Sequence, residues 1–197
     1  MKRFLVVALA VVMAICSLTM TGCSLLEKIG IGKEGVSFEE FSEKAKSLET
    51  LDPVLTSGTA YFKFSGDEDF GPDIRFEFDE EGELTISKSN FDMYYSGVHQ
   101  IIELTLSSAV DNFAWTVTET EEKDEKTERG DQFKTTVVYE TKNEFSVKII
   151  DYMKTVKGNE AESISYKKFD ARTGYLVEHY SKSNSGTEVT LKIDWDK

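Results

Sequence analysis

The pattern that most constrains this chain is an alternation of apolar and polar residues that recurs from Val54 onward. Phe62 and Phe64 alternate with their neighbours, and residues 74–78 repeat the pattern. Period-two alternation is typical of strands with one face in the core and the other in solvent. The same pattern predicts further strands over residues 84–86, 100–107, 112–120, 132–141, 144–151, 162–169, 175–182 and 187–195.

Short clusters of turn-forming residues separate most of these segments. The clusters are Glu80-Glu81-Gly82, Asp111-Asn112, Gly130-Asp131, Lys142-Asn143, Gly158-Asn159, Arg172-Thr173-Gly174 and Asn184-Ser185-Gly186. Strands joined by short links pair with their chain neighbours in an antiparallel meander. We therefore expect about nine or ten strands in one sheet. Such a sheet would curve strongly or form an unclosed barrel, because an open edge invites wrong pairing.

One segment before the strands has the period of a helix. Ser37 is a candidate N-cap, and Glu40 follows at the capping-box spacing. The apolar face repeats at three- and four-residue steps through Phe38, Phe41, Ala45 and Leu48. We expect this helix to run from Ser37 to Thr50 and to cover the concave, apolar side of the sheet as a lid. The expected fold is thus mainly β with one N-terminal helix (α+β), in a single domain over residues 37–197.

The first residues of the chain have the features of an export signal. Lys2 and Arg3 give a basic start, and the seventeen residues from Phe4 to Met20 carry no charge. A membrane-spanning helix is the alternative, because a run of this length is at the short end of the range that crosses a bilayer. Either case places the following domain outside the cytoplasm, and only the anchor differs.

Met20-Thr21-Gly22-Cys23 resembles the lipobox of bacterial lipoproteins, with Met20 where leucine is usual. The resemblance implies that the thiol of Cys23 receives a diacylglyceryl group and that a peptidase removes residues 1–22 as a lipoprotein signal peptide. Two acyl chains hold a protein stably on a membrane, whereas one does so only marginally. Residues 23–36 would then be a lipidated, flexible tether between the membrane and the domain.

The lipobox resemblance also implies a location and a mature composition. The protein would be lipid-anchored on the extracytoplasmic face of the cell membrane, and Ser24 favours the outer membrane in a host with two membranes. Loss of Lys2 and Arg3 leaves 21 of the 23 Lys and Arg against 36 Asp and Glu, a formal charge of −15. This acidity opposes nucleic-acid binding, which uses Lys- and Arg-rich surfaces. With Cys16 removed and Cys23 acylated, the domain would contain no disulfide.

No pattern in the chain indicates catalysis, a cofactor or a metal site. His99 and His179 belong to no zinc-type cluster, and we expect His179 to be exposed on its strand, opposite to Glu178. The acidic residues of 66–73 lack the spacing of an EF-hand, so a polar loop is expected there. The mixed charges of 119–131 are typical of a solvated hairpin tip. We therefore predict a protein that is not an enzyme and has no resident cofactor or metal.

Most of the 23 aromatic residues lie in the expected strands. Core packing explains aromatic residues in sheets, and an apolar cavity between the curved sheet and its helix is the alternative. The order of one helix and a long meander, with a turn of the D-x-x-T-G type at Asp170 to Gly174, resembles the LolA/LolB-like lipoprotein carriers and their LppX-like relatives. The resemblance implies an unclosed barrel with a helical lid over a cavity that accepts acyl chains, and it carries over no catalytic residue.

Two functions follow from these observations, and the sequence leaves both open. The first is a cell-envelope lipoprotein that binds a hydrophobic small molecule or a lipid between sheet and helix. The second is a structural or interaction lipoprotein that binds another envelope protein through its sheet surface. The second would show as an exposed apolar patch on the order of a few hundred Å².

Overall fold

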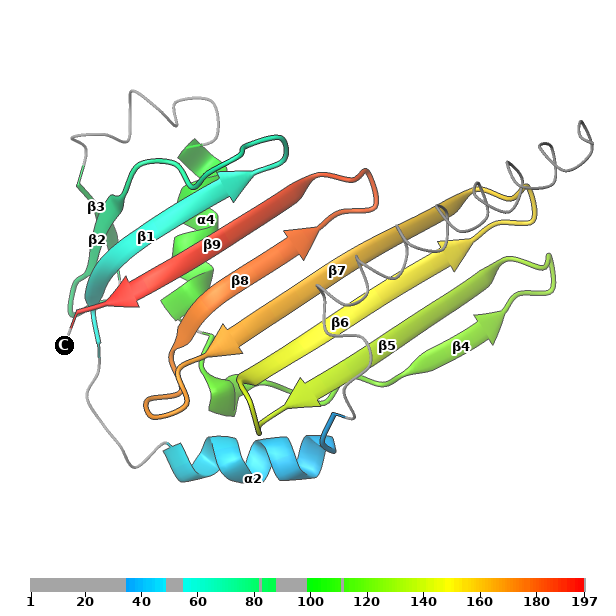
Figure 1. Cartoon of the computed structure of the whole chain (residues 1–197), viewed down its shortest axis with the longest axis horizontal. Coiled ribbons are helices and arrows are strands. Elements are labelled where there is room, and N and C mark those ends of the chain that lie inside the picture. Colours follow the sequence, from blue (N-terminus) through cyan, green and yellow to red (C-terminus); the bar gives the residue numbers. More distant parts are fainter. Residues whose placement is uncertain (1–34, 49–54, 82, 88–98, 111, 197) are drawn as a thin grey trace, which may run out of the picture. The chain divides into compact units, whose positions relative to one another are not determined.

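The structure of the 197-residue chain is a computed structural model that describes residues 35–48, 55–81, 83–87, 99–110 and 112–196. Residues Val36–Lys197 form one compact unit of the chain, whose helices and strands are shown in Figure 1. The expected signal peptide, the lipidation site Cys23 and all of the tether except residues 35 and 36 lie outside the described residues.

Nine strands of the described residues form a single antiparallel sheet that does not close (Figure 1). The strands are β1 (Ser57–Phe64), β2 (Ile74–Phe78), β3 (Leu84–Ile86), β4 (Lys123–Lys126), β5 (Gln132–Glu140), β6 (Phe145–Lys154), β7 (Glu160–Phe169), β8 (Leu176–Lys182) and β9 (Glu188–Trp195). Their order is β3-β2-β1-β9-β8-β7-β6-β5-β4, which confirms the expected fold class. The sheet consists of two meanders, β1–β3 and β4–β9, which join where β9 pairs with β1.

The register of the strands places the main hydrophobic core on one face of the sheet, which we call the core face. Ala60 and Phe62 of β1 pair with Ile193 and Leu191 of β9, and all four side chains are buried. On β2, buried apolar residues alternate with exposed charged ones in the same way. Since successive side chains of a strand point to opposite faces, the intervening residues form an outer face. This outer face is charged on β2, but it carries the buried apolar pair Ile150 and Ile164 where β6 meets β7.

Helix α2 (Phe38–Leu48) is the helix expected from the sequence, and it packs on the core face beside β6. The Oγ of Ser37 accepts a hydrogen bond from the N–H of Glu40 (3.2 Å), which confirms Ser37 as its N-cap. The ring of Phe41 is fully buried, and its centroid lies 4.7 Å from that of Phe145. Ring contacts at this distance add to the burial of the two side chains and hold α2 on the sheet.

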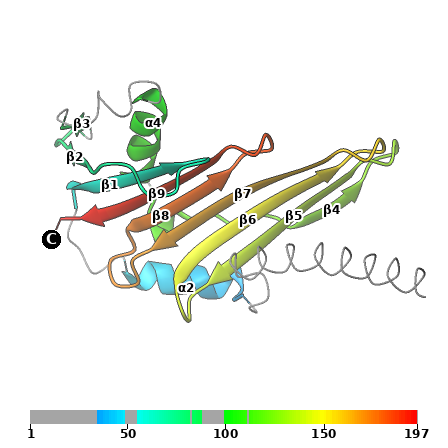
Figure 2. The same ribbon diagram turned by 45° about the horizontal axis from the view of Figure 1, so that its top comes forward.

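Residues 100–107 form a helix, so the strand expected there is wrong, and the described part of the chain has a second α-helix. Helix α4 (His99–Val110) buries Ile102 and Leu106, four residues apart, in the same core cluster as the sheet. The alternation that predicts a strand here consists of Ile102, Leu104 and Leu106, but Leu104 is 65% exposed. The β-branched residues of this segment favour a strand locally, and packing against the core overrides that preference. Figures 1 and 2 show α2 and α4 on the same side of the sheet.

Residues 112–120, which we call the strap, lie over the core face and do not form the expected strand. They contain a short 3-10 helix, η1 (Ala114–Thr116), and Phe113 makes only an isolated bridge with Tyr175. The rings of Phe113 and Trp115 stack with centroids 4.7 Å apart, and both meet the ring of Tyr175 edge-on. The alternating large side chains thus hold the strap on the β7–β8 turn and not in a ladder of hydrogen bonds.

Strand β4, at one edge of the sheet, is not predicted by the sequence pattern. All four of its residues are charged and exposed. Charged residues on an edge strand discourage pairing with other chains. Residues 121–129 are all exposed, which agrees with the solvated hairpin expected over 119–131.

Candidate functional site

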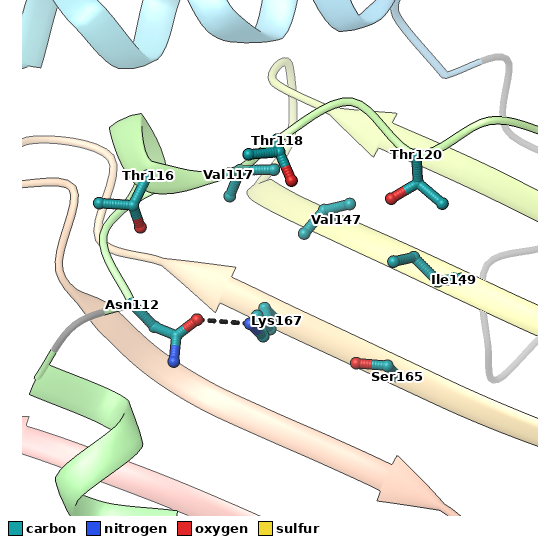
Figure 3. A pocket seen from close by; sticks show the side chains of 9 residues that line it. All are labelled: Asn112, Thr116, Val117, Thr118, Thr120, Val147, Ile149, Ser165 and Lys167. Carbon is teal, nitrogen blue, oxygen red and sulfur yellow. Dashed lines mark hydrogen bonds between the residues drawn. The ribbon is translucent and has the colours of Figure 1, made fainter.

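A hollow of about 160 Å³ lies on the core face between the strap and strands β6 and β7 (Figure 3). Its described lining residues are Asn112, Thr116, Val117, Thr118, Thr120, Val147, Ile149, Ser165 and Lys167. Under α2, in contrast, the side chains of Phe41, Phe145 and Phe169 fill the space and are all buried. The hollow therefore lies beneath the strap and not beneath the helix that the sequence predicts as a lid.

The floor of the hollow is built by two cross-strand pairs. Val147 of β6 pairs with Lys167 of β7, and Ile149 pairs with Ser165. The two residues of each strand are two positions apart, so all four side chains point to the same face. Figure 3 shows them beneath the strap, with the apolar residues on β6 and the polar residues on β7. The floor thus has an apolar half and a polar half.

The roof of the hollow is the strap, which is fixed at both ends. The N–H of Ala114 donates to the carbonyl oxygen of Gly174 (2.8 Å), and the N–H of Thr120 donates to the hydroxyl of Tyr139 (3.2 Å). From Thr116 to Thr120 the strap places three threonines and one valine over the floor. A roof held in this way can keep the hollow open when no ligand is bound, which lowers the ordering cost of binding.

Lys167 is the one charged residue among the described residues that line the hollow. Its Nζ donates a hydrogen bond to Oδ1 of Asn112, and Nδ2 of Asn112 donates to the carbonyl oxygen of Ser108 in α4. The Lys167 side chain is half-buried, and this burial lowers its pKa below the usual 10.5. The ammonium group is thus held in place by an amide and is partly removed from water.

His179 is half-buried on the core face, so its expected exposure is wrong. In the sheet it lies directly between Lys167 of β7 and Leu191 of β9. Burial, together with the positive charge of Lys167, lowers the pKa of His179 to about 4. Its imidazole is therefore neutral at pH 7 beside the lysine. The side chain of His99 lies outside the described residues.

The acidic loop between β1 and β2 has a structural role at Asp67. Oδ2 of Asp67 accepts a hydrogen bond from the N–H of Phe64 (2.9 Å), which closes the turn after β1. Within the described ranges, no group of three or more His, Cys, Asp or Glu side chains is arranged to hold a metal ion.

Sequence reasoning does not identify Lys167 or the hollow. On β7, the residues at odd positions from Ser163 to Lys167 are polar, and they share a face with the buried Phe169. A strand whose inward face changes from apolar to polar is a signal that this part of the face is not dry core. That signal becomes readable only when the register is known, because the opposite face of β7 also carries large side chains, Tyr166 and the buried Ile164.

Comparisons with known proteins do not place this chain in a group. No family model matches it, and no curated protein is significantly similar in sequence. Of the two described α-helices, neither has the length and apolar content that crossing a membrane requires.

Proposed function

We propose that this protein is a non-enzymatic lipoprotein of the cell envelope, anchored through Cys23, that binds a hydrophobic ligand in the hollow beneath the strap. The anchor is supported by the lipobox-like residues that precede Cys23. Ligand binding is supported by one observation above all: the hollow is roofed by Val117 and floored by Val147 and Ile149.

The volume of the hollow limits the size of the ligand. Sites that enclose a drug-sized molecule measure about 300–1,000 Å³, whereas a cavity of about 150 Å³ holds benzene. At about 160 Å³, the hollow has room for a small hydrophobic molecule or for the end of a single chain. A ligand with two acyl chains does not fit inside it.

Two observations support a binding role over catalysis. In the described part of the chain, no hydrogen bond joins Ser165 to Lys167 or His179, so the site does not pair a nucleophile with a base. In addition, His179 is held neutral by its surroundings and lies beside the hollow, not among its lining residues.

Methyl NMR of the intact protein in phosphatidylcholine nanodiscs tests ligand binding. With valine and isoleucine methyl groups labelled, 1-hexanol should shift the signals of Val117, Val147 and Ile149 in a saturable way. Val147→Thr should weaken binding about fivefold, because it adds a hydroxyl to the apolar half of the floor. Val138→Thr makes the same change on the outer face and should have no effect. Shifts spread evenly over the protein, or equal effects of both variants, would contradict the proposal.

Labelled palmitate tests the anchor. The parent chain and a Cys16→Ser variant should both incorporate the label, and a Cys23→Ser variant should not, because the resemblance places the acylated thiol at residue 23. Normal processing of Cys23→Ser, with the same partition into membranes as the parent, would contradict the anchor.

The interaction lipoprotein remains a second candidate, and it is favoured by exposed apolar residues in the hairpins at the ends of β4–β7. Phe133 is 41% exposed and Val156 is 65% exposed. Photo-crosslinkers at these two positions, compared with one at the outer-face residue Lys134, would detect a specific envelope partner. Equal crosslinking at all three positions would count against this candidate.

A further inference from the structure

The charge environment of Lys167 differs from that of other lysines in the sheet. Lys168, its neighbour on β7, lies 3.7 Å from a carboxylate oxygen of Glu144, and Lys182 lies 3.6 Å from one of Glu162. Lys167 has only the amide oxygen of Asn112 as its partner in the described residues. In a chain with 36 acidic residues, the hollow thus has a cation and, in its described lining, no carboxylate.

An anion in the hollow would compensate this charge. Removing an ammonium group from water costs free energy unless an opposite charge or good hydrogen bonds replace the water. A single amide oxygen uses one of the three N–H donors of the ammonium group. The hydroxyls of Ser165 and Thr118 line the same hollow and add donors for an anion.

The apolar half of the hollow defines the rest of the ligand. Val147 is directly across the ladder from Lys167, so an anionic group at the lysine places the attached chain over Val147 and Ile149. Val117 of the strap closes this half from above (Figure 3). The two halves therefore suit the two ends of one amphiphilic molecule.

Resting on the proposed function, we propose that the ligand is a small amphiphilic acid whose carboxylate or phosphate binds Lys167 and whose short apolar chain lies between Val117 and the floor of β6. Both headgroups share the chemistry that an ammonium group recognises, since each is an anion with several acceptor oxygens. Hydrogen bonds to charged groups are stronger than those between neutral groups. The acid should therefore bind more tightly than the matching alcohol.

Four probes with the same chain test this inference on the intact protein in phosphatidylcholine nanodiscs. They are hexanoate, hexyl phosphate, 1-hexanol and hexylammonium, and binding is measured from the methyl signals of Val147 and Ile149. At least one acid should bind about tenfold more tightly than 1-hexanol, and hexylammonium should bind more weakly than 1-hexanol. The tighter of the two acids identifies the headgroup as a carboxylate or a phosphate.

Lys167→Met and Lys168→Met form a matched pair of variants. Lys167→Met removes the charge and keeps an apolar stem, so the preference for the acids over 1-hexanol should be lost. Lys168→Met removes the neighbouring charge on the outer face and should leave every affinity as in the parent. If Lys167→Met does not fold, Lys167→Gln provides the same comparison.

The outcomes separate this inference from the proposed function. If 1-hexanol binds but the acids bind no more tightly, or if Lys167→Met keeps the preference for acids, the acid headgroup is excluded and the hydrophobic site remains. If no probe shifts the methyl signals of Val147 and Ile149, both the inference and ligand binding in the hollow are overturned.

Discussion

On β9 the core face carries Leu191 and Ile193, which are both buried, whereas on β7 the same face carries Ser165 and Lys167, which are half-buried. The first region packs with the aromatic residues of β1 and β2, and its space is filled by side chains. The second region is roofed by the strap and leaves the hollow. One sheet thus divides its core face between a dry part, which contributes stability, and a partly wet part, which is suited to binding.

The largest expected effect comes from the dry part. Phe62→Ala removes a fully buried ring and should lower the free energy of unfolding by about 3–5 kcal/mol. Phe133→Ala is the control on the same face, at a position that is 41% exposed, and should cost less than about 1 kcal/mol. Denaturant unfolding of the two variants measures both values. Similar losses would contradict the division of the face.

The next effect concerns the attachment of the strap. Gly174 has a φ of +74°, and a Cβ added there would lie 2.5 Å from Cζ3 of Trp115. Gly174→Ala should therefore cost about 2–4 kcal/mol and change the tryptophan fluorescence. Gly158→Ala, at a φ of +82° with no atom within 4 Å of the added Cβ, should cost only about 1 kcal/mol. Equal losses at both positions would show that the ring of Trp115 does not limit residue 174.

A smaller effect is expected from the pH dependence of stability. His179 has a pKa of about 4 in the folded protein and about 6.5 when unfolded, so the unfolded chain binds more protons between these values. The neutral form of His179 contributes fully to the free energy of unfolding above pH 6.5. This contribution decreases as the pH falls toward 4, and about 2 kcal/mol of it has been lost at pH 5. His179→Leu should remove this part of the pH dependence. An unchanged slope between pH 7 and pH 5 would contradict the burial of His179.

The smallest effect separates two adjacent lysines. Lys167→Met should raise the free energy of unfolding by about 0.5 kcal/mol, because it removes a partly desolvated charge. Lys168→Met breaks a surface ion pair and should change stability by less than about 0.5 kcal/mol, in the destabilising direction. Thermal unfolding of both variants beside the parent gives the sign of each change in stability. A loss on Lys167→Met would show that the bond to Asn112 outweighs the cost of burial.

The sequence predicts those parts of the fold in which local pattern and packing agree. The strands from β5 to β9 and helix α2 are found because their periodicity continues over many residues and turn or cap residues mark their ends. Residues 100–107 differ, because their local preference is for a strand while the spacing of Ile102 and Leu106 fits a helix. The choice between the two depends on the core against which the segment packs, and that core is not a local property.

The candidate site is harder to predict for the same reason. Lys167 and Lys168 are adjacent and alike in sequence, and only the register of β7 decides which of them points into the hollow. A shift of one residue would exchange their faces. The strap that completes the site has the pattern of a strand, and its role depends on contacts with Tyr175, more than fifty residues away.

The pairing of β9 between β1 and β8 has a consequence for how the domain is made. Among the nine strands of the sheet, the one that is synthesised last joins the two meanders, so the sheet cannot be completed until residues 188–195 have emerged. Contacts between such distant segments form slowly. For the exported lipoprotein proposed above, this delay is an advantage, because folding before export would block passage through a translocation channel.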